Sequence, residues 1–76
     1  MSTKLSEVPV NKTVKILNID KNCSSKTRKR LLEMGLIKGE DIFIKKFAPL
    51  KDPIEIEVKG YNLSLRKNEA DFILVE

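Results

Sequence analysis

One segment, Ile54-Glu-Ile-Glu-Val-Lys-Gly-Tyr-Asn-Leu-Ser-Leu65, alternates apolar and polar side chains on both sides of Lys59-Gly60. A two-residue turn at Lys59-Gly60 would join two antiparallel strands into a hairpin. This turn sets the register and places six apolar residues on one face: Val58 opposite Tyr61, Ile56 opposite Leu63, and Ile54 opposite Leu65. A shift by one residue would turn one strand's apolar side chains to the other face. The turn and the pattern therefore predict the same hairpin.

Three more strands are indicated on either side of this hairpin. The first covers Thr13–Ile19, where the alternation slips and predicts a bulge near Leu17. The second covers Asp41–Phe47, and the last covers Asp71–Glu76, whose run of apolar residues indicates that both of its faces are covered. Before the last strand, Lys67–Ala70 is long enough only for one tight helical turn.

The sequence predicts one longer helix over Ser24–Met34. Its first turn can be capped by the hydroxyl of Ser24 or Ser25. One face carries apolar side chains at helical spacing, and Gly35 is suited to end the helix in a left-handed conformation. We expect Leu36 to fold back against Leu31, the usual apolar contact at such a helix end.

These elements predict a mainly β domain, a small five-stranded SH3-like barrel with one α-helix between strands 1 and 2. Curling into a barrel hides the edges of short strands. An OB barrel more often carries its helix between the third and fourth strands, so the SH3-like form is favoured. We expect residues 1–12 to form a polar, loosely ordered lead-in and residues 13–76 to form the domain.

Composition agrees with one small globular domain. The 76 residues are 41% hydrophobic and 34% charged, which is typical of a folded chain. A single cysteine allows no internal disulfide. No charged-then-apolar leader opens the chain, and no stretch approaches the roughly 20 apolar residues that cross a bilayer. We therefore expect a cytoplasmic protein.

Catalytic chemistry has little support in the sequence, and we expect neither an enzyme nor a cofactor. The chain has no His, and its glycines stand alone at turns rather than in a phosphate-binding loop. Cys23 lies among lysines ahead of a helix, so it is either a reactive thiol or, as we favour, a small apolar plug. Asp52, Glu55 and Glu57 resemble a metal cluster, but alternating charges on a strand usually face water, and we predict no metal site.

The net charge of +4 is concentrated between Lys21 and Arg30. A solvated helix face explains such a run most simply. The alternatives are a docking surface for an acidic protein or an anionic membrane, and a nucleic-acid site. Nucleic-acid binding would need exposed aromatic side chains for stacking, for which only Phe43 and Phe47 are candidates.

Three motifs in order resemble the FeoA family. They are Arg30-Leu-Leu-Glu-Met-Gly-Leu-Ile-Lys-Gly39, Ala48-Pro-Leu-Lys-Asp-Pro-Ile54 and Gly60-Tyr-Asn-Leu-Ser-Leu-Arg-Lys67. The resemblance covers nearly the whole chain, although the family often has Gly at the position of Lys51 and the first 12 residues fall outside it. It implies a small cytosolic SH3-like domain that accompanies the bacterial ferrous iron transporter FeoB.

The resemblance implies a non-enzymatic accessory that docks on the cytosolic part of FeoB and is peripheral to the membrane through that partner. Modulation of the transporter's GTPase or assembly is part of this hypothesis. An uncovered strand edge leaves weak self-association open. The alternative function is a small basic nucleic-acid-binding module.

We expect the docking surface to combine the helix with the loop that follows the second strand. Its predicted partner-binding residues are Arg28, Leu32, Leu36, Pro49, Leu50 and Asp52. Arg28 would supply charge and the leucines would anchor the partner. The other role open to Asp52 is to hold the shape of the loop by hydrogen bonding to its backbone.

Overall fold

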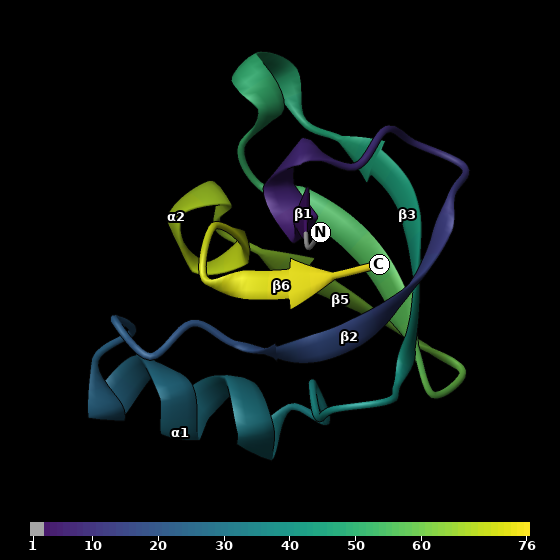
Figure 1. Ribbon diagram of the computed structural model, residues 1–76. Helices are drawn as coiled ribbons and strands as arrows, with labels where there is room; N and C mark the ends of the chain where they lie inside the picture. The colour runs from purple at the N-terminus through teal and green to yellow at the C-terminus, as the bar shows by residue number, and fades with distance from the viewer. Residues whose placement is uncertain (1–2) are drawn as a thin grey trace.

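The computed structural model describes residues 3–76, which form a six-stranded antiparallel sheet in the order β1-β6-β2-β3-β4-β5 (Figure 1). Two α-helices and two short 3₁₀ helices connect the strands. The elements in chain order are β1 (Thr3–Lys4), η1 (Leu5–Glu7), β2 (Thr13–Ile19), α1 (Ser25–Glu33), β3 (Asp41–Phe47), η2 (Pro49–Lys51), β4 (Ile54–Val58), β5 (Tyr61–Leu65), α2 (Lys67–Ala70) and β6 (Ile73–Val75).

The β4–β5 hairpin has the predicted register. Val58 lies opposite Tyr61, and the two inner pairs follow in step. Lys59 and Gly60 have φ values of 53° and 82°, the positive values that a type I′ hairpin turn requires. Ile54, Ile56, Val58 and Leu65 are buried and Leu63 is partly buried against the core, whereas Tyr61 is 40% exposed. The predicted apolar face therefore packs on the core except at Tyr61.

The predicted bulge in β2 is confirmed. Ile16 pairs with Val75 and Asn18 pairs with Leu74, so Leu17 is the extra residue between them. The bulge lets β2 serve two neighbours, because its first half pairs with β3 and its second half with β6. Ile16 and Ile19, on either side of the irregularity, are both buried.

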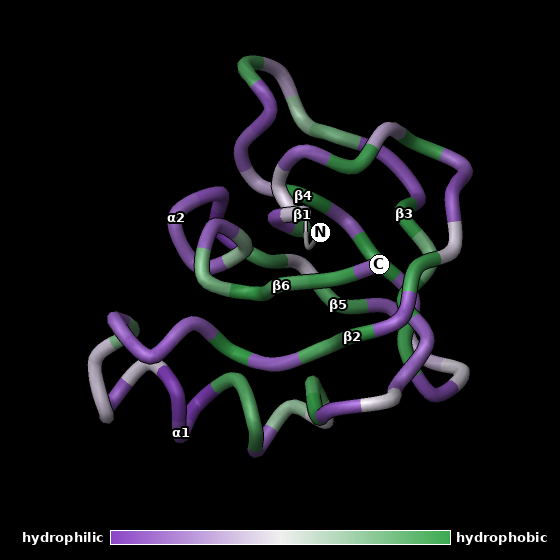
Figure 2. The backbone as a smooth tube through the Cα atoms, in the orientation of Figure 1, coloured by the Kyte–Doolittle hydropathy of each residue, from purple (hydrophilic) through white to green (hydrophobic). Residues whose placement is uncertain are grey.

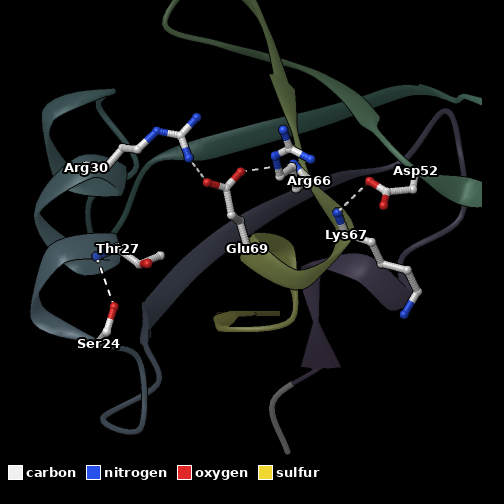
Figure 3. Close-up of polar contacts among 7 residues, drawn as sticks. All are labelled: Ser24, Thr27, Arg30, Asp52, Arg66, Lys67 and Glu69. Carbon is white, nitrogen blue, oxygen red and sulfur yellow. Dashed lines mark hydrogen bonds and ion pairs between the residues drawn. The ribbon is translucent and has the colours of Figure 1, made fainter.

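Helix α1 begins and ends as the sequence indicates. The Ser24 hydroxyl oxygen accepts a hydrogen bond from the Thr27 N–H at 3.2 Å (Figure 3). At the other end Gly35 has φ +91°, and the Leu36 N–H donates to the Leu31 carbonyl at 3.1 Å. This is the Schellman arrangement, and it brings two fully buried leucines together.

Two features of the predicted architecture need correction. The sheet has six strands rather than five and is not closed, and residues 3–76 contain two α-helices rather than one, because the helical turn expected at Lys67–Ala70 is the helix α2. The additional strand, β1, pairs with β6 through Thr3 and Lys4. A two-residue strand has no periodicity that a sequence pattern can reveal. In the chain order of the structure, α1 lies between β2 and β3.

The N-terminal residues contribute to the core. Leu5 and Val8 fall within the expected polar lead-in, yet both side chains are buried. The apolar interior consists mainly of Ile, Leu and Val side chains, and Figure 2 shows these positions along β4 and β6 at the centre of the molecule. The same view shows α1 as hydrophilic in its first turns and hydrophobic toward its end. Met1 and Ser2 of the lead-in lie outside the described residues.

Candidate functional site

The six predicted docking residues do not form one continuous surface. Arg28, Leu32 and Leu36 belong to α1 and the turn after it, whereas the others belong to the loop around η2. Figure 1 shows η2 and α1 at opposite ends of the molecule. A single patch that combines the tip of this loop with α1 is therefore not present.

The residues in and after α1 have three different environments. Leu36 is fully buried, so its side chain does not reach the surface. Arg28 uses its guanidinium Nη2 to donate to the backbone oxygen of Asp20 at 2.9 Å, which fastens the helix to the segment after β2. Leu32 is 43% exposed and is the leucine of this group that a partner can touch.

The loop around η2 presents an apolar side chain to solvent. Leu50 is 97% exposed, and its φ of 64° and ψ of 18° lie in the left-handed region. Lys51, next to it, also has a positive φ of 63°. The base of the loop is closed by Ala48, whose N–H donates to the Pro53 carbonyl at 3.0 Å. Leu50 therefore projects from a hydrogen-bonded loop whose conformation L-residues normally avoid.

Asp52 connects this loop to the start of α2. Its Oδ1 accepts a hydrogen bond from the Lys67 N–H at 3.0 Å (Figure 3). The side chain thus does hold the loop, but through the backbone of a distant segment rather than through the loop's own backbone. Sequence patterns do not reveal that pairing, because 15 residues separate the two partners.

A polar groove lies below the loop, between α1 and the end of β5. Its larger part is a pocket of about 440 Å³ lined by Arg30, Asp52, Pro53, Ser64, Arg66 and Glu69. A second pocket of about 250 Å³ adjoins it, and Asp52 and Arg66 line both. We call these two pockets together the polar groove.

Glu69 organises one wall of the polar groove. It is only 7% exposed, and its carboxylate forms an ion pair with Arg30 of α1. The same carboxylate accepts a hydrogen bond from the Arg66 N–H at 3.0 Å (Figure 3). The sequence reasoning missed Arg30, Arg66 and Glu69, although a Glu three residues after a helix cap is a recognisable signal of such a contact.

Replacing Glu69 with Ala is expected to lower the free energy of unfolding by about 1–2 kcal/mol, because the Arg66 N–H loses its acceptor and the link between α1 and α2 is removed. Half of the Arg30 side chain is exposed, which limits the loss. Urea denaturation measures the change. Glu55→Ala is the matched control, since Glu55 pairs with Lys46 at the surface and should matter by less than about 0.5 kcal/mol. Equal effects of the two variants would contradict this role of Glu69.

The other residues considered for chemistry lie in ordinary structural positions. The Cys23 side chain is 7% exposed and belongs to the apolar core, as expected for a small apolar plug. Within residues 3–76, no three His, Cys, Asp or Glu side chains are grouped so that they could hold a metal ion. The lysines of the basic run, Lys21, Lys26 and Lys29, are exposed to solvent.

Comparison with known proteins identifies a family. The model of the FeoA domain matches residues 3–76, which includes most of the segment that the sequence motifs left out.

No helix in the described part of the chain is both long and apolar enough to span a bilayer.

The proteins that resemble the chain include two solved structures and one curated relative. The NMR structure of a FeoA-like protein from Clostridium acetobutylicum has a TM-score of 0.89 and 43% identity, covering 99% of this chain and 85% of that one. The zinc complex of FeoA from Stenotrophomonas maltophilia, an SH3 domain protein, has a TM-score of 0.82 and 27% identity, covering 100% and 89%. A Fe(2+) transport protein A/Fe(2+) transporter FeoB fusion protein from Porphyromonas gingivalis is 47% identical over 49 residues, which are 64% of this chain and 6% of that protein.

Proposed function

The chain belongs to the FeoA domain family, which is linked to ferrous iron transport, and from this membership we propose that it is a non-enzymatic accessory of bacterial ferrous iron uptake that docks on the cytosolic part of FeoB. The Porphyromonas gingivalis fusion protein supports this partner, because it joins transport protein A and the transporter FeoB in one chain. Parts that are fused in one organism commonly work together when they are separate chains in another. None of these comparisons favours the alternative of a nucleic-acid-binding module.

Leu50 is the observation that carries the docking proposal. The Leu50 side chain is 97% exposed, so its burial adds almost nothing to the free energy of folding. Its left-handed backbone costs about 1–2 kcal/mol relative to an ordinary conformation. A glycine would remove that cost. Strain of this kind at an exposed side chain is typical of a functional position. We infer that Leu50 enters an apolar pocket of the partner.

The remaining predicted residues receive different parts in this proposal. Pro49 flanks the anchor and shares its exposed surface. Asp52 holds the loop in place through the Lys67 N–H. Leu32, at the far end of the molecule, would serve a second contact, while Arg28 and Leu36 support the helix that carries it. Docking in this way would keep the protein in the cytoplasm and peripheral to the membrane through FeoB.

An amide chemical-shift titration with the cytosolic part of FeoB tests the partner and the surface together. We expect shifts at Leu50 and its loop neighbours in at least one nucleotide state of the transporter. A pull-down with detergent-solubilised FeoB tests the whole transporter. If the chain binds FeoB in none of its nucleotide states in either experiment, the proposed function is wrong.

A further inference from the structure

Arg66 is the one charged side chain of the polar groove without a partner among residues 3–76. Arg30 pairs with Glu69, and Lys67 lies 3.9 Å from Asp71. The Oδ1 atom of Asp52 accepts a hydrogen bond from the Lys67 N–H. The guanidinium of Arg66 forms no hydrogen bond or ion pair with the described residues, yet Arg66 lines both pockets of the groove. Its donors are therefore available to a molecule that enters from outside.

The backbone of Arg66 is fixed even though its side chain is unpaired. The Arg66 N–H donates to Glu69, and the neighbouring Lys67 N–H donates to Asp52. Figure 3 shows Arg66 between these two carboxylates, with Arg30 reaching toward Glu69 from the side of α1. Neither carboxylate forms an ion pair with the Arg66 guanidinium among the described residues, although each accepts a backbone N–H. The fixed backbone reduces the freedom that Arg66 would lose on binding.

The donors that face the groove suit a carboxylate. A guanidinium presents two parallel N–H groups that match the two oxygens of a carboxylate. The hydroxyl of Ser64, which lines the same pocket, is a further donor. Most of the net charge of +4 lies between Lys21 and Arg30, and Arg30 at the end of this run lines the groove, so an acidic partner meets a basic surface beside the groove.

We infer that the polar groove binds a carboxylate side chain from an acidic segment of the cytosolic part of FeoB, with Arg66 as the principal contact. This inference rests on the proposed function and extends it to a second subsite. Asp52 and Pro53, at the base of the loop that presents Leu50, line the groove. One partner surface can therefore supply an apolar pocket to Leu50 and a carboxylate to Arg66.

A titration with acetylated tetraglutamate tests the groove without FeoB. We expect shifts of the Ser64 and Arg66 amides and of the Arg66 Nε–H signal, and no comparable shifts with tetraglutamine. Arg66→Ala should remove these shifts. Lys29→Ala is the matched control, because it removes one exposed positive charge from α1 and leaves the groove intact. Shifts that are spread over the lysines, or that both variants reduce equally, would overturn the inference. So would binding of inorganic phosphate to Arg66 in the absence of tetraglutamate binding.

The affinity for FeoB separates this inference from the proposed function. Arg66→Ala is expected to weaken binding to the cytosolic part of FeoB about tenfold, since a hydrogen-bonded charge pair is lost. Arg66→Lys should recover only part of the loss, because an ammonium group does not bind a carboxylate in the same two-point manner. Unchanged binding of Arg66→Ala to FeoB would overturn the inference about the polar groove and leave the proposed function standing. Binding of tetraglutamate by a chain that does not bind FeoB would overturn the proposed function and FeoB as the source of the carboxylate, and would leave only the carboxylate site in the groove standing.

Discussion

Replacing Leu50 with Gly is expected to weaken binding to the cytosolic part of FeoB about 30-fold while leaving the chain equally or more stable. Burial of a leucine side chain in a partner's pocket contributes about 2 kcal/mol, which corresponds to that change in affinity. The isolated chain has little to lose, because the side chain is 97% exposed. Glycine adopts the left-handed conformation without the steric cost that leucine meets there, although its unfolded state is more flexible. Calorimetric titration measures the affinity, and urea denaturation measures the stability.

The control for Leu50 is another exposed apolar residue. Ile37 is 41% exposed and lies outside the loop around η2, so Ile37→Ser should change the affinity for FeoB by less than twofold. The opposite result is a normal affinity for FeoB in Leu50→Gly and a weaker affinity in Ile37→Ser. It would place the docking surface at the end of α1 instead of at the loop around η2. A drop in stability of Leu50→Gly clearly greater than the roughly 1 kcal/mol that a more flexible unfolded state explains would show that contacts of the leucine itself hold the loop.

Replacing Leu31 with Ala should lower the free energy of unfolding by about 2–5 kcal/mol, as is usual for a leucine in a packed core. Leu31 is fully buried and is the one buried residue of α1. The total stability expected for 76 residues is only about 4–11 kcal/mol. The variant is therefore expected to populate the unfolded state, which a shift of the urea midpoint detects.

Leu32 provides the matched control for Leu31. It is the next residue of the same helix, with the same side chain, but it is 43% exposed. Leu32→Ala should change the free energy of unfolding by less than about 1 kcal/mol, because nearly half of this residue already contacts water, whereas Leu31 is fully buried. Similar losses in the two variants would show that α1 packs by a different face from the one described.

Local patterns predicted a large part of the fold. The β4–β5 register, the bulge at Leu17, and the beginning and end of α1 each depend on residues that are close in sequence. A turn or a cap acts over a few residues, so its signal survives without knowledge of the rest. β1 was missed because its pairing with β6 joins opposite ends of the chain over only two residues.

The candidate site was harder to predict because it is made of long-range contacts. The apolar character of its loop predicts Leu50 as a docking residue, and the structure shows that its side chain is exposed and its backbone left-handed. The same apolar character predicts Leu36 as a docking residue, but the structure buries it at the helix end that it completes. The pairing of Arg30 with Glu69 connects elements far apart in sequence, and no spacing rule relates them.

The pairing of β1 with β6 has a practical consequence for how this module can be joined to other proteins. Thr3 lies opposite Val75, so both ends of the described chain leave from neighbouring strands, as Figure 1 shows near its centre. A polypeptide attached at either end would start from the same side of the domain, away from the tip that carries Leu50. Domains with adjacent termini tolerate insertion and fusion well. A fluorescent label or a covalent tether to a larger protein can therefore be placed at either terminus without covering the Leu50 tip.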